Sequence, residues 1–141
     1  LLTGFSGIVF FNILKSKPDQ LEAYKAKRFI EKKILTLPLN QKQKLQFTTT
    51  LLEKRLAETE YIVTAMKFDL LREVTSRHAT QAGEYAALPG ANAAVLLQHR
   101  EKLEYLYNNF PHDNYIDLRR DLLNDNTNYL NIYIAQLNAK K

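Results

Sequence analysis

The chain has 141 residues, of which 45% are hydrophobic, and it carries 20 Lys and Arg, 15 Asp and Glu and no cysteine. A chain of this length buries a sizeable core as one domain without disulfides or a structural metal. The missing cysteines exclude disulfide scaffolds, cysteine-ligated metals and cysteine nucleophiles, and they leave the redox compartment undecided.

The excess of positive charge is concentrated near the N-terminus. Residues 15–44 contain nine basic and three acidic side chains, a net charge of +6, whereas the rest of the chain sums to −1. Such a stretch suits anionic lipid headgroups as well as nucleic-acid phosphates. Its central part supplies the candidate membrane- or partner-contacting residues, which are Lys25, Lys27, Arg28, Lys32 and Lys33.

Residues 1–14 are uncharged and mostly apolar. They are too few to span a bilayer, which takes about 20 apolar residues. Because the chain begins with Leu instead of Met, we expect it to derive from a longer product. We therefore favour the end of a truncated membrane anchor over a buried helix of the bundle, and we assign residues 15–141 to one helical bundle domain.

The first helix is expected over residues 20–37, after the start signal Pro18-Asp19. Pro38 disfavours helix at the preceding residue, and Asn40 is placed to cap the next helix.

That next helix carries the strongest periodic signal in the sequence. Apolar residues recur at helical spacing from Leu45 to Val74, which predicts one long helix with four buried side chains, Leu52, Leu56, Val63 and Leu70. A fresh helix capped by Asp69 after a kink near Lys67 is the alternative. We favour continuation because the apolar seam crosses that point unbroken.

Two further helices follow the turn signal Leu88-Pro89-Gly90. One is expected over residues 92–109 and the other over residues 115–137, where Asn124-Asp125-Asn126 weakens the middle. No strand-like alternation of convincing length is present. The sequence thus predicts an all-α fold, an antiparallel bundle of four or five helices with one long central helix.

The chain lacks the sequence signatures of an active site or a cofactor site. No glycine-rich phosphate loop and no nucleophile elbow is present, and His78, His99 and His112 lack metal-ligand spacing. We therefore expect no enzyme activity, no metal and no cofactor. His99 lies on the apolar stripe between Leu96 and Leu103, which favours a core imidazole bonded to a neighbouring helix over a pH-responsive or ligand-contacting residue.

Three short motifs carry a resemblance to a known group of proteins. The run Tyr24-Lys25-Ala26-Lys27-Arg28-Phe29-Ile30-Glu31 resembles the Tyr-x-x-Lys-Arg-x-x-Glu opening of a bacterial helical domain of unknown function, found in secreted or membrane-anchored proteins. Arg55-Leu56-Ala57-Glu58 and the run from His99 to Glu104 agree with it. The chain lacks the Pro-Gly turn expected before Tyr24.

The resemblance implies a tethered, extracytoplasmic helical module without an assigned activity. The matched residues are interpreted as structural ties between helices, because Arg55 and Glu58 are three residues apart and Lys27 and Glu31 are four apart. The candidate ties are Tyr24, Glu31, Arg55, Glu58 and His99. Basic residues beside a membrane helix favour the cytoplasmic side, so that side stays open.

Three functions are consistent with these features. The first is a non-enzymatic, membrane-tethered module that senses a ligand or binds an unknown protein partner, and it is favoured by the apolar start and the basic stretch. The second is an accessory subunit of a larger membrane complex. The third is a basic nucleic-acid-binding domain, which is disfavoured because no helix-turn-helix spacing is present.

Overall fold

The computed structural model describes residues 29, 31–33, 37–111 and 116–140, and their regular structure is entirely helical. The elements are α3 (Gln41–Thr64), the short 3-10 helix η1 (Phe68–Leu70), α4 (Leu71–Ala86), α5 (Ala93–Asn108) and α6 (Ile116–Ala139). The all-α prediction is confirmed. Residues 29 and 31–33 are helical, but most of the helix expected over 20–37, and all of residues 1–14, lie outside the described residues.

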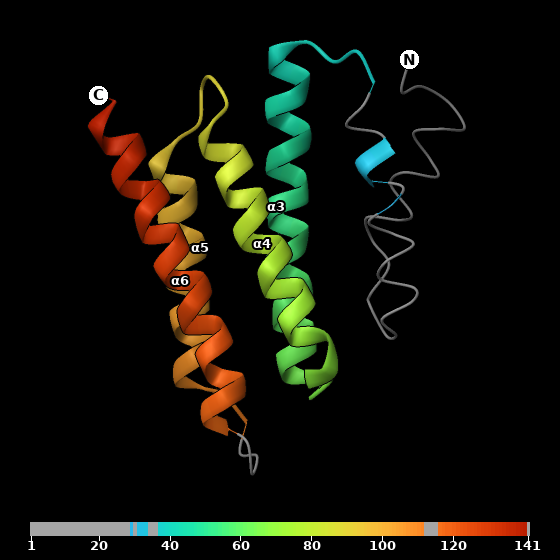
Figure 1. Cartoon of the computed structure of the whole chain (residues 1–141), viewed down its shortest axis with the longest axis vertical. Helices are drawn as coiled ribbons and strands as arrows, with labels where there is room; N and C mark the ends of the chain where they lie inside the picture. The colour runs from blue at the N-terminus through green and yellow to red at the C-terminus, as the bar shows by residue number, and fades with distance from the viewer. Residues whose placement is uncertain (1–28, 30, 34–36, 112–115, 141) are drawn as a thin grey trace.

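The helices form an up-and-down bundle (Figure 1). Helices α3 and α5 run in one direction and α4 and α6 in the other, so that α4 and α6 are parallel to each other. Helix α4 packs against both α3 and α6, whereas α5 packs mainly against α6. The chain therefore passes over one end of the bundle between α4 and α5, and it leaves α4 and α6 as neighbours along their length.

Local signals in the sequence set most of the helix ends. The Asn40 side chain accepts a hydrogen bond of 2.8 Å from the Gln43 amide, and the Gln43 side chain accepts one from the Asn40 amide, which completes a capping box. Asn92 caps α5 through the Ala94 amide. Between α4 and α5, Gly90 has a φ of 89°, a left-handed conformation that glycine adopts without strain. The predicted cap and turn are both confirmed.

The single helix expected over residues 45–74 is wrong, because α3 ends at Thr64. Met66 adopts a φ of 57°, the Lys67 amide bonds the Ile62 carbonyl, and the Met66 amide bonds the Val63 carbonyl. This is the hydrogen-bond pattern of a Schellman motif, with a left-handed residue just after the helix. The seam crosses the turn because α3 and α4 contribute to the same core.

Three of the four side chains expected to be buried in that span, Leu52, Val63 and Leu70, lie in the core, and Leu56 is half-buried. Met66, which lies within the span of the expected apolar seam, is 51% exposed. Asp69 does not cap α4, which begins without a side-chain cap. Helix α5 keeps its predicted stripe, since Leu96, His99 and Leu103 are all buried, and Leu106 and, just after the helix, Phe110 are buried as well.

Replacing Met66 by glycine is expected to stabilise the bundle. A left-handed backbone is strained for an ordinary side chain, and the exposed Met66 side chain contributes little packing that would be lost. We expect Met66→Gly to raise the free energy of unfolding by about 0.5–1 kcal/mol in urea titrations. Met66→Ala is the control, because it removes the same side chain and keeps the strain. Equal stabilities for the two variants would contradict this interpretation of the turn.

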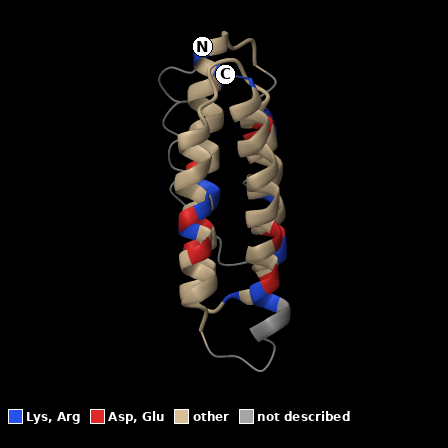
Figure 2. Cartoon of the chain, turned by 90° about the vertical axis from the view of Figure 1, so that its left-hand side faces the viewer, with Lys and Arg blue, Asp and Glu red and all other residues tan. Residues whose placement is uncertain are grey.

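Charged residues occupy the outer surface of the bundle. Figure 2 shows basic and acidic residues interleaved on the face formed by α5 and α6. On α5, Glu101 and Glu104 are exposed, and Arg100 lies 3.8 Å from the Glu104 carboxylate. The carboxylates of α5 therefore lie on a solvated surface that carries an ion pair one helical turn long.

Candidate functional site

A layer of buried polar side chains crosses the middle of the hydrophobic core. Each of the four long helices contributes one member: Arg55 from α3 is 0% exposed, His78 from α4 is 0%, His99 from α5 is 4% and Asn126 from α6 is 2%. Burying such groups is costly unless each is hydrogen-bonded or paired with an opposite charge. Their partners therefore define what the layer does.

His78, His99 and Asn126 form a hydrogen-bonded chain across three helices. His78 Nε2 lies 2.9 Å from His99 Nδ1, and the two rings are stacked at 5.1 Å between centroids. On its other side, His78 Nδ1 lies 3.0 Å from Asn126 Nδ2 and 3.3 Å from Asn126 Oδ1. His78 thus links α5 to α6 through its two ring nitrogens.

Both imidazoles are neutral at pH 7. Burial, with His99 and Arg55 acting in the same direction, lowers the pKa of His78 to about 3, although the hydrogen bond to Asn126 acts to raise it. Burial alone lowers the pKa of His99 to about 4. A neutral imidazole has one N–H donor and one acceptor nitrogen, so each ring can donate one hydrogen bond and accept another.

The two histidines must therefore hold the same tautomer. If Asn126 presents its oxygen, His78 donates from Nδ1 and accepts at Nε2 from the His99 Nδ1–H. If Asn126 presents its NH2 group, the His78 Nδ1 accepts and the His78 Nε2–H donates to His99. Any mixed combination places two protons or two lone pairs between the rings, which a buried pair cannot tolerate.

Arg55 binds two carboxylates in the same layer. Its Nη2 donates to both carboxylate oxygens of Glu31, and its Nη1 lies 2.9 Å from a Glu58 oxygen. Glu31 and Glu58 are buried, and Glu31 comes from the short helical segment before α3. The ion cluster thus attaches that segment to the bundle.

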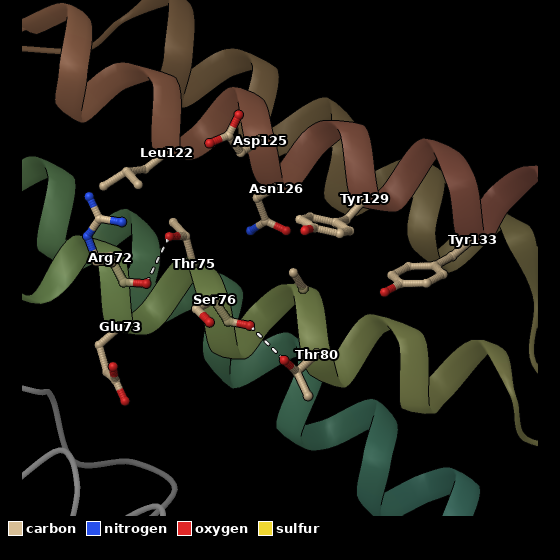
Figure 3. Close-up of a pocket in the computed structure, with 11 residues that line it drawn as sticks. Arg72, Glu73, Thr75, Ser76, Thr80, Leu122, Asp125, Asn126, Tyr129 and Tyr133 are labelled. Atoms are coloured by element: carbon tan, nitrogen blue, oxygen red, sulfur yellow. Dashed lines mark hydrogen bonds between the residues drawn. The ribbon is translucent and has the colours of Figure 1, made fainter.

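A groove lies between α4 and α6, directly outside Asn126. It encloses about 510 Å³, and Figure 3 shows the residues that line it. On the α4 side, four short side chains make room between the helices, and Arg72 and Glu73 line one end. The α6 side carries two tyrosines, and a Cβ at Gly83 would lie 2.9 Å from the Tyr133 hydroxyl, so Tyr133 packs closely on α4. The central lining residues are Thr75, Ser76, Ala79, Thr80, Asn126 and Tyr129.

The structure brings together some of the residues predicted from the sequence. Arg55, Glu58 and Glu31 meet in the ion cluster, with Glu31 bound to Arg55, and His99 is the core imidazole bonded to a neighbouring helix. Lys32 and Lys33 are exposed, and the Lys33 ammonium lies 5.3 Å from the centre of the Phe29 ring. Tyr24, Lys25, Lys27 and Arg28 lie outside the described residues.

Sequence reasoning missed His78 and Asn126. His78 lies in a polar, small-residue stretch, and Asn126 lies in an asparagine run that was interpreted as a weak point of the last helix. The signal was present in their spacing. His78 lies four residues after the buried Val74 and four before the buried Ala82, and Asn126 lies between Leu123 and Leu130, so both are on buried faces.

Two further findings limit what the described residues can form. Among residues 29, 31–33, 37–111 and 116–140, no three His, Cys, Asp or Glu side chains are grouped as a metal site requires. In the same part of the chain, no helix combines the length and the hydropathy needed to cross a membrane.

Comparison with protein-family models, with curated proteins and with solved structures finds no match for this chain. The resemblance to a bacterial tethered helical domain therefore stays a prediction.

Proposed function

We propose that this chain is a non-enzymatic sensing module, in which the groove between α4 and α6 binds a small ligand. One observation carries the proposal. Asn126 lines the groove and is also the first member of the hydrogen-bonded chain to His78 and His99. A ligand that forms a hydrogen bond with Asn126 thereby affects the hydrogen bonds of His78 and, through His78, those of His99 on α5.

Burial of the histidines favours sensing over catalysis. General acid-base catalysis requires the imidazole to come within hydrogen-bond reach of the substrate. A molecule in the groove contacts Asn126, whereas His78 is fully buried behind it. An amide side chain offers hydrogen bonds but does not exchange a proton with a substrate at neutral pH. The groove therefore suits reversible recognition.

The proposal includes attachment to a membrane on the N-terminal side of the bundle, with the extracytoplasmic side favoured. Attachment is supported by the sequence of residues 1–14, the basic stretch that follows, and the exposure of Lys32 and Lys33. The extracytoplasmic side is supported by the resemblance alone, because the basic stretch itself favours the cytoplasmic side. Basic side chains near an anionic bilayer contribute about 1 kcal/mol each. The unknown partner of such a module would contact the bundle or the stretch that carries these lysines.

Ligand binding in the groove is tested by thermal shift with amino acids, organic acids, amines and sugars. We expect at least one compound to raise the melting temperature of the full chain, because binding to the folded state alone stabilises it. Thr80→Trp places a large side chain in the groove from an exposed position and should abolish that shift. Gln98→Trp, at an exposed position on α5, is the matched control and should keep it.

The stabilising compound should also be recovered chemically unchanged after prolonged incubation. Conversion of the compound, or a melting shift that survives Thr80→Trp, would contradict a non-enzymatic groove.

A further inference from the structure

Building on the proposed function, we infer that the ligand of the groove is a small carboxylate that carries an aromatic ring. The groove presents hydrogen-bond donors at one end and in its middle, and two tyrosine rings at the other end.

Three charged residues line the groove, Arg72, Glu73 and Asp125, and of these Arg72 is directed across it. Figure 3 shows the Arg72 guanidinium directed toward α6, and Arg72 makes no ion pair with another described residue. Glu73 points away from α6, and its carboxylate lies 3.7 Å from Arg77. The Asp125 carboxylate points away from α4. An anion would therefore bind at the Arg72 guanidinium, the charged lining side chain that is directed across the groove toward α6.

Ser76 and Asn126 extend the row of donors beyond Arg72. Ser76 is exposed and follows Arg72 by one helical turn on the same face of α4. Asn126 faces the groove from α6, and its amide has two N–H donors. A planar guanidinium with flanking neutral donors matches a carboxylate, because a carboxylate accepts several hydrogen bonds at once.

The other end of the groove suits a flat apolar group. Tyr129 and Tyr133 lie one turn apart on α6, and the short Ala79 side chain lines the groove on α4. Aromatic rings pack against one another in offset or edge-to-face arrangements. Seven residues separate Arg72 from Ala79, roughly 10 Å along the helix axis. The arginine side chain covers part of this distance, and a short linker between the carboxylate and the ring of the ligand covers the rest.

This ligand class selects one state of the buried chain. A carboxylate accepts from the Asn126 NH2 group, which turns the Asn126 oxygen toward His78. His78 then donates from Nδ1, and His99 donates from its own Nδ1 to His78 Nε2. Ligand binding in the groove thereby fixes the tautomer of His99 on α5.

The test measures binding of 3-phenylpropanoate to the full chain by calorimetry and by NMR. Its comparison compounds are 3-phenylpropylamine, which replaces the carboxylate by an ammonium, and propanoate, which lacks the ring. We expect 3-phenylpropanoate to bind and both comparison compounds to bind at least about tenfold more weakly. Arg72→Gln should weaken the binding of 3-phenylpropanoate by about 10- to 100-fold. Arg77→Gln, on the same helix but outside the groove lining, should leave the affinity unchanged.

Equal binding of the amine, an unchanged affinity in Arg72→Gln, or no binding of 3-phenylpropanoate would overturn the carboxylate assignment. Other outcomes test the proposed function itself. If an amine or a sugar binds and Thr80→Trp abolishes that binding, the groove is a ligand site of another class. If no compound responds to Thr80→Trp, the groove itself is refuted as a ligand site.

Discussion

Lowering the pH from 7 to 5 is expected to reduce the free energy of unfolding by up to about 4 kcal/mol, about 2 kcal/mol for each buried histidine. In the unfolded chain an imidazole takes up a proton near pH 6.5, whereas in the bundle the pKa is about 3 for His78 and about 4 for His99. Protons below pH 6.5 therefore bind the unfolded chain preferentially. The contribution of the two histidines to the free energy of unfolding is fully present above pH 6.5 and is lost progressively as the pH falls toward the folded-state pKa values.

Urea titrations at half-unit pH steps measure this loss. The double variant His78→Leu, His99→Leu is the control and should show a nearly flat stability between pH 7 and pH 5. Burial raises the pKa of Glu84, which opposes the histidine effect in both proteins and cancels in the comparison. Equal pH dependence of the wild type and the double variant would show that the histidines are not buried as neutral groups.

The second large effect is expected at Arg55. Arg55→Ala removes the guanidinium that binds the buried carboxylates of Glu31 and Glu58. Removing one side of a buried charge cluster costs about 3–5 kcal/mol, because the remaining charges stay in a medium that solvates them poorly. The segment that carries Glu31 should also detach from α3, which limited proteolysis of residues 29–33 detects.

Two control variants separate the charge effect from the loss of packing. Arg77→Ala removes a partly exposed arginine whose ion pair spans 3.7 Å, and it should cost at most about 1 kcal/mol. The triple variant Arg55→Met, Glu31→Leu, Glu58→Leu removes all three charges and should recover most of the lost stability. If the triple variant is as unstable as Arg55→Ala, packing volume and not charge pairing explains the effect.

The sequence was sufficient to predict the fold class, the Asn40 cap, the turn at Gly90 and the later helices, because these depend on local chemistry. Asn40 and Gly90 act within a few residues of their own positions. The turn after Thr64 could not be predicted in this way. No glycine or proline marks it, and the left-handed conformation at Met66 is held by the packing of α4 on α3.

The candidate site was predictable only in part for a related reason. Arg55 and Glu58 are neighbours on one helix, so their contact follows from spacing. His78 and Asn126 are 48 residues apart, and their contact depends on α4 and α6 being adjacent and parallel. Sequence order favours pairing of consecutive helices, whereas α4 and α6 are separated by α5 in the chain, so the groove between them had no local signature.

The coupling between the groove and α5 is tested most directly by long-range 1H–15N NMR of the two histidine side chains at pH 8. The protein measured is Asn126→Asp, with Asn128→Asp, at an exposed position on α6, as the control. A carboxylate at position 126 only accepts hydrogen bonds, so His78 must donate from Nδ1. We predict that His99, which is bonded to His78, then also carries its proton on Nδ1, and that the two rings hold the same tautomer in the control as well. Different tautomers on the two rings, or a His99 that keeps its proton on Nε2 when His78 donates from Nδ1, would contradict the coupling.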